Sequence, residues 1–254
     1  MNALVAGLVS AVILGLGGWF PSPPTALPVA PPLSIAPVAG IPEPCPARHP
    51  WPSSATPAVT RKTMEQAFGL QLTGAGWTNP ANRPLMKIVW ETLDAVSCTS
   101  YLDDVRRNSG QRVIRIHAGP TRSWAWGDWG LTNPGRLTFD FAKWHSAYPS
   151  DKGRLVRIVI HELGHMHQMK PGGHQADLDS FRALYSRHGG FSKYGRGSSS
   201  ETMSEVIGYY VSRCALDNPY DRAGASQRAY YEWAKNSVFK GVEFGPAPGV
   251  RPEC

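Results

Sequence analysis

The sequence lacks several features that would place it in common classes. No Lys or Arg occurs before Arg48, the four cysteines include no C-x-x-C pair, and there is no run of basic residues and no internal repeat. The missing cysteine pairs argue against a cysteine metal cluster. A net charge of +7 without a basic run or a stacking motif argues against nucleic-acid recognition. That charge instead favours association with an anionic cell surface.

The first 58 residues show the composition of an exported chain. Residues 1–20 are almost wholly apolar, so we expect a signal peptide or an N-terminal membrane anchor. Residues 21–58 hold 13 of the 23 prolines, which predicts an extended linker. Residues 59–254 are long enough for one domain with a hydrophobic core. We therefore predict a protein that is secreted or membrane-anchored, with this domain outside the cytoplasm.

The four cysteines form an even set, and in an exported chain they predict two disulfides. Three pairings are open. We favour Cys45 with Cys98 and Cys214 with Cys254, because each pair would tie a terminal segment to a helix near it in sequence.

The most informative motif is His161-Glu162-Leu163-Gly164-His165. Two histidines four apart on a helix project from one face and can bind one zinc ion, with Glu162 beside the open coordination position. The apolar spacing upstream predicts a buried helix at residues 152–169, with Ser150 or Asp151 as its N-cap and Pro171 beyond its end.

A catalytic zinc site needs a third protein ligand. The metzincin pattern would place glycine and histidine where Gln168 and Pro171 stand, so that class is excluded. A second helix, opened by a serine cap near residue 198, carries Glu201 and Glu205 four apart on one face. Glu201 can reach the metal while Glu205 steadies a ligand histidine. The other candidates are Asp177, Asp179 and His174.

His-Glu-Leu-Gly-His, Tyr194-Gly195-Arg196 and Glu201-x-x-x-Glu205 together resemble the catalytic domain of the gluzincin zinc peptidases that include anthrax lethal factor and the Pro-Pro endopeptidases. The likeness covers about residues 150–212. It implies an α+β zincin-like fold, with a small mixed sheet and a helical C-terminal half. It also implies roles in this chain: Zn²⁺ ligands at His161, His165 and Glu201, a general base at Glu162, transition-state stabilisation by Tyr194, and support of a ligand histidine by Glu205.

The remaining pattern predicts helices at residues 64–68 and 85–97 and strands at 112–117, 124–126 and 137–141. By the resemblance, residues 137–141 would be the edge strand that pairs with an extended peptide. The tryptophans of this region are candidates either for the cleft or for the core, and they are Trp124, Trp126 and Trp129.

The sequence thus predicts an exported zinc metalloendopeptidase acting on a protein or peptide substrate. Two other hypotheses stay open: a non-catalytic surface-binding module with a zincin fold, and a zinc amidase acting on a cell-wall amide.

Overall fold

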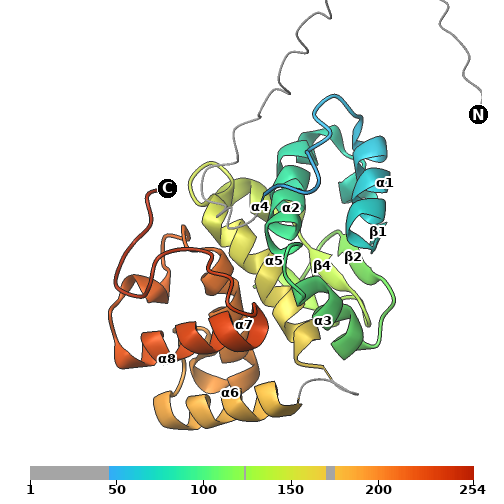
Figure 1. Cartoon of the computed structure of the whole chain (residues 1–254). Coiled ribbons are helices and arrows are strands. Elements are labelled where there is room, and N and C mark those ends of the chain that lie inside the picture. The colour runs from blue at the N-terminus through green and yellow to red at the C-terminus, as the bar shows by residue number, and fades with distance from the viewer. Residues whose placement is uncertain (1–45, 123, 170–174) are drawn as a thin grey trace, which may run out of the picture. The chain divides into compact units, whose positions relative to one another are not determined.

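The computed structural model describes residues 46–122, 124–169 and 175–254, and these form eight α-helices and a four-stranded sheet (Figure 1). The predicted α+β class is confirmed. The helices are α1 Pro57–Phe68, α2 Arg83–Val96, α3 Tyr101–Ser109, α4 Phe141–Ala147, α5 Lys152–His167, α6 Gln175–His188, α7 Ser199–Val211 and α8 Ala225–Trp233. The strands are β1 Leu70–Thr73, β2 Ile114–Ala118, β3 Gly127–Trp129 and β4 Leu137–Phe139.

The sheet is mixed, with the strand order β1-β2-β4-β3. β1, β2 and β4 are parallel, while β3 runs antiparallel to β4. The prediction that residues 137–141 form an edge was wrong, because β4 lies between β2 and β3. All three of its side chains, Leu137, Thr138 and Phe139, are fully buried, as an interior strand requires. The edge next to β4 is β3.

The strand predicted at residues 124–126 was also misplaced, since the strand is β3, beginning at Gly127. Asp128 explains where the strand stops. Its carboxylate accepts the backbone N–H groups of Leu131 and Thr132, at 3.1 and 3.0 Å, and so closes the turn that follows.

Helix α5 carries the His-Glu motif and lies between the sheet half and the helical C-terminal half of the described region (Figure 1). Asp151 caps it as predicted by accepting the Arg154 N–H. The apolar side chains of α5 are buried, which confirms a core helix; they include Leu155, Val159 and Leu163.

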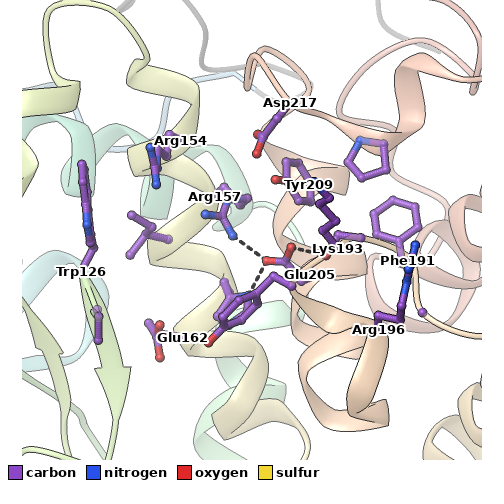
Figure 2. A pocket seen from close by; sticks show the side chains of 18 of the residues that line it. Trp126, Arg154, Arg157, Glu162, Phe191, Lys193, Arg196, Glu205, Tyr209 and Asp217 are labelled. Carbon is purple, nitrogen blue, oxygen red and sulfur yellow. Dashed lines mark hydrogen bonds and ion pairs between the residues drawn. The ribbon is translucent and has the colours of Figure 1, made fainter. Parts of the chain in front are cut away.

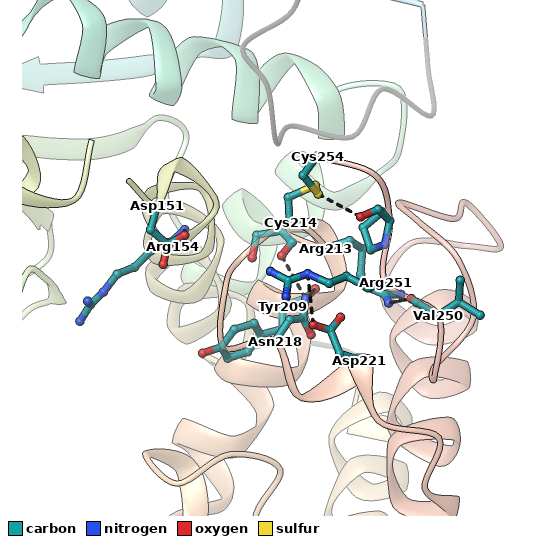
Figure 3. The surroundings of a disulfide bond; sticks show 12 residues. Asp151, Arg154, Tyr209, Arg213, Cys214, Asn218, Asp221, Val250, Arg251 and Cys254 are labelled. Atoms are coloured by element: carbon teal, nitrogen blue, oxygen red, sulfur yellow. Dashed lines mark hydrogen bonds and ion pairs between the residues drawn. A yellow bond between two sulfur atoms is a disulfide. The ribbon is translucent and has the colours of Figure 1, made fainter. Parts of the chain in front are cut away.

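Helices α6, α7 and α8 form the C-terminal half. Ser198 caps α7 by accepting the Glu201 N–H, which confirms the serine cap. Past the end of α7, Cys214 and Cys254 form one of the two predicted disulfides (Figure 3). This bond connects the end of the chain to the segment that follows α7.

The segment 46–58, which the sequence placed in the linker, contacts the domain in the structure. The backbone N–H of His49 donates to Asp94, and the indole N–H of Trp90 donates to the His49 carbonyl. Residues 1–45, including the predicted leader and Cys45, lie outside the described residues, so the Cys45–Cys98 pairing stays a prediction. Among the described helices, none is long and apolar enough to cross a membrane.

Candidate metal centre

His161, His165 and Glu201 bring three ligand atoms together. His161 Nε2 lies 3.2 Å from His165 Nε2, and Glu201 Oε2 lies 3.2 and 3.4 Å from these two nitrogens. Glu201 Oε2 is buried and makes no hydrogen bond of good geometry among the described residues. Three lone-pair atoms that face one another at such distances, one of them lacking a donor, form a group that could bind a metal ion.

The approach of α5 and α7 positions these groups. A Cβ on Gly164 would lie 3.1 Å from the Cα of Ser204, and a Cβ on Gly208 would lie 3.1 Å from the Arg157 carbonyl. The two glycines, one on each helix, therefore allow the backbones to pack closely. Because Gly164 lies within the motif, this close contact brings Glu201 of α7 opposite the two histidines of α5.

Glu205 lies one turn beyond Glu201 and contacts His161 from the other side. Its Oε1 is 3.0 Å from His161 Nδ1 and 2.5 Å from the Arg157 guanidinium, and its Oε2 accepts the Ser192 hydroxyl at 2.7 Å. Burial opposes ionisation of this carboxyl, yet His161 and Arg157 lower its pKa to about 2. Glu205 is therefore an anion held where it can orient the His161 ring.

The carboxylates change the protonation of the histidine between them. Burial lowers the pKa of His161, but the adjacent Glu201 and Glu205 carboxylates raise it by more, to about 9. Burial likewise opposes ionisation of Glu201, yet the two imidazoles keep its pKa well below the usual range. The negative potential that holds a proton here would also attract a metal cation, which would bind in exchange for that proton.

Glu162 and Tyr194 both line a cavity of about 710 Å³ next to this group (Figure 2). Glu162 is buried, and that burial raises its pKa above the ordinary value of a glutamate. Tyr194 is 54% exposed, with its ring centroid 5.8 Å from that of His161. Burial and the carboxylates of Glu201 and Glu162 raise the Tyr194 pKa to about 12, so the phenol keeps its proton at neutral pH.

The other predicted candidates are located elsewhere or outside the described residues. The Asp177 carboxylate lies 4.0 Å from Lys240, and Asp179 pairs with Arg182 on the same helix. Neither aspartate belongs to the group that could bind a metal. His174 lies outside the described residues.

The cavity also contacts the sheet edge. A Cβ on Gly127 of β3 would lie 2.8 Å from Ile158 Cγ2 and 3.1 Å from Glu162 Cγ. Glycine therefore lets the strand pass directly over α5 at Glu162. Two of the three candidate tryptophans, Trp124 and Trp126, line the cavity.

Sequence reasoning missed Arg157, Ser192 and Gly127. Arg157 could have been identified from the sequence, because it stands four residues before His161 and so shares its helix face. Ser192 and Gly127 gave no comparable signal, since loop and strand residues approach α5 only through the tertiary fold.

Comparison of the chain with models of protein families, with curated proteins and with solved structures found no match.

Proposed function

We propose that this chain is an exported zinc-dependent metalloendopeptidase of gluzincin type with a zincin-like fold. The observation that carries the proposal is the meeting of His161 Nε2, His165 Nε2 and Glu201 Oε2 at 3.2–3.4 Å from one another, beside a cavity lined by Glu162. Two nitrogens and one carboxylate oxygen form the ligand set that hydrolytic zinc sites use, with one position left for water or substrate.

The spacing of the three atoms is compatible with zinc. Zinc binds these atoms at about 2.0–2.2 Å, so two ligands of a tetrahedral site stand roughly 3.3–3.6 Å apart. The three distances are within about 0.1 Å of that range. Contact between Glu205 and His161 Nδ1 adds the outer carboxylate that commonly accompanies a zinc-bound histidine.

Zinc held there would supply Lewis acidity, polarising a substrate carbonyl and making water a stronger acid. Glu162 would take the proton of the attacking water and pass it to the departing amine. The Tyr194 phenol, which lines the same cavity, would donate a hydrogen bond to the negative charge that develops on the carbonyl oxygen.

A peptide substrate is favoured by the free edge of β3. The strand pairs only with β4 among the described strands, and it runs over Glu162. An extended peptide that adds to this edge would bring its backbone carbonyl to the metal group. The Cys214–Cys254 disulfide supports an oxidising compartment, as export would provide.

The test uses the full chain, with zinc content and peptide-library cleavage measured on wild type and on single variants. We expect Glu162→Gln to keep one zinc and lose cleavage, and Glu201→Ala to lose zinc. Tyr194→Phe should keep zinc and cut roughly a hundred- to a thousandfold more slowly. The control is Asp177→Ala, which should retain both zinc and activity.

Normal zinc in Glu201→Ala would contradict the ligand assignment. A wild-type protein that binds zinc but cuts no peptide would instead favour the amidase or the binding module.

A further inference from the structure

The backbone groups that β3 offers to a substrate can be assigned from its pairing with β4. The Asp140 N–H donates to the Trp126 carbonyl, and the Gly130 N–H donates to the Arg136 carbonyl. Because bonded residues alternate along an antiparallel pair, the backbone groups of Gly127 and Trp129 point to the free edge. These two residues are therefore the ones that can pair with a peptide.

The direction of β3 relative to α5 follows from two contacts. The Trp126 ring lies 4.4 Å from the Arg154 guanidinium carbon, and the next residue, Gly127, packs on Ile158 and Glu162. Thus β3 and α5 run in the same sense over this stretch. Antiparallel strand pairs are commoner than parallel ones. A peptide that pairs antiparallel with β3 runs along α5 from Glu162 toward Arg154. The residues after the cut bond, on the side of the departing amine, then lie over Ile158 and Arg154.

The cavity has more cationic than carboxylate side chains. Five cations and three carboxylates line the cavity as a whole. Arg157 is neutralised by Glu205, and the third carboxylate, Asp217, bonds the Tyr209 hydroxyl. The other four cations are exposed and form no ion pair with a carboxylate among the described residues; they are Arg154, Lys193, Arg196 and Arg222.

The cations come from two sides. Arg154 projects from α5, while Lys193 and Arg196 belong to the segment before α7, on the opposite side of the cavity (Figure 2). Seven residues separate Arg154 from His161 on one helix, which corresponds to about 10 Å of rise. That length equals roughly three residues of an extended peptide. The Arg154 guanidinium thus lies within reach of the first three residues that follow the scissile bond.

We propose that the cavity binds a carboxylate of the substrate on the side of the departing amine. The carboxylate is either an Asp or Glu side chain within about three residues after the cut bond or the free C-terminal carboxylate of a short peptide. Arg154 binds it, and the other exposed cations that line the cavity, Lys193 among them, add positive potential. This inference rests on the proposed peptidase function, which it deepens by naming the substrate class.

The test begins with a proteome-derived peptide library cut by the full-length wild-type protein. We expect Asp and Glu to be enriched at one of the first three positions after the cut, or cuts to gather within three residues of a free C-terminus. Synthetic versions of one cleaved peptide then separate the two sources: Glu against Gln at the enriched position, and a free C-terminus against an amide. The carboxylate form should have a kcat/KM about tenfold or more above its neutral partner, as one charge-assisted hydrogen bond would give.

Charge-reversal variants test which cations cause the preference for a carboxylate. Arg154→Glu and Lys193→Glu should reduce that ratio toward one while the zinc content stays unchanged. The matched control is Arg187→Glu, which reverses an exposed cation of α6 that does not line the cavity and should keep the wild-type ratio.

Cleavage without any carboxylate preference would overturn the inference and leave the peptidase function standing. A preference that survives equally in all three variants would also overturn it. If no peptide is cut, the peptidase function fails and this inference fails with it.

Discussion

Glu205 contacts one of the three candidate metal ligands but is not itself one of them. It is almost fully buried, and it contacts the His161 ring, the Arg157 guanidinium and the Ser192 hydroxyl. A carboxylate with cationic partners on two sides stays ionised inside the protein. In the proposed zinc site, Glu205 would therefore hold the His161 ring in the orientation that points Nε2 at Glu201 and His165.

We predict that Glu205→Gln weakens zinc binding about 10- to 100-fold, the usual effect of losing an outer carboxylate. The amide has the same shape but no charge to match Arg157 and His161. The measurement is a zinc titration against a chromophoric chelator, with circular dichroism to check that the variant is folded.

Glu243→Gln is the matched control, because Glu243 pairs with Lys235 at the surface and should leave zinc affinity unchanged. A folded Glu205→Gln protein with wild-type affinity would show that Glu205 does not support the site.

At the scale of elements, the site depends on the contact between α5 and α7. Each helix has a glycine at this contact, Gly164 against Ser204 and Gly208 against the Arg157 carbonyl oxygen. The Gln168 side chain also donates to the Ser204 hydroxyl, at 2.9 Å. The same contact that fills the core thus sets the distance between the histidines and Glu201.

Gly164→Val should therefore affect stability and metal together. The added Cβ would stand 3.1 Å from the Cα of Ser204, so α7 must move away. We expect the free energy of unfolding to fall by about 1–3 kcal/mol, as overpacking in a core usually causes. Zinc affinity should fall as well, because Glu201 moves with α7. Urea denaturation and zinc titration of the same variant measure both effects.

For comparison, Gly197→Ala adds a Cβ that meets nothing within 4 Å and should change neither quantity. The idea that helix packing sets the ligand distance is wrong if Gly164→Val loses stability but keeps full zinc affinity.

At the scale of the whole described domain, both a disulfide and side-chain hydrogen bonds hold the C-terminal segment in place. Cys214 and Cys254, 40 residues apart, form a disulfide, and the buried Arg213 donates to the carbonyls of Pro246 and Val250 (Figure 3). The backbone after Cys214 lies against the first turn of α5, where a Cβ on Gly153 would stand 2.5 Å from the Ala215 nitrogen. The disulfide therefore stabilises the segment that supports the start of the motif helix.

Replacing both cysteines, Cys214→Ser with Cys254→Ser, should lower the free energy of unfolding by up to about 4 kcal/mol, the loop entropy expected for this separation. The measurement is urea denaturation of the oxidised wild type and the double variant. Adding Arg213→Met should cost more, because two carbonyls then lose their donor. A double variant as stable as wild type would mean that Arg213 alone secures the segment.

Local patterns predicted the elements that carry the chemistry. The motif helix, its Asp151 cap and the serine cap of α7 follow from residues within one or two turns, and the structure has them. Element ends and short strands were less accurate. The motif helix ends at His167, two residues before the expected end, and a strand was expected at residues 124–126 where the structure has β3 at Gly127–Trp129. The sequence alone also does not distinguish a tryptophan that lines a cavity from one that packs in the core.

The sequence by itself determined which residues could bind a metal, because the spacing of His161 and His165 on one helix is local geometry. It also narrowed the third ligand to Glu201 and a few alternatives. Only the tertiary structure decided that Glu201 meets the histidines, that β3 and not β4 is the edge, and that four unpaired cations share one cavity. The physical reason is that these contacts join residues far apart in the chain, and packing of α5 against α7 and the sheet alone sets their distances.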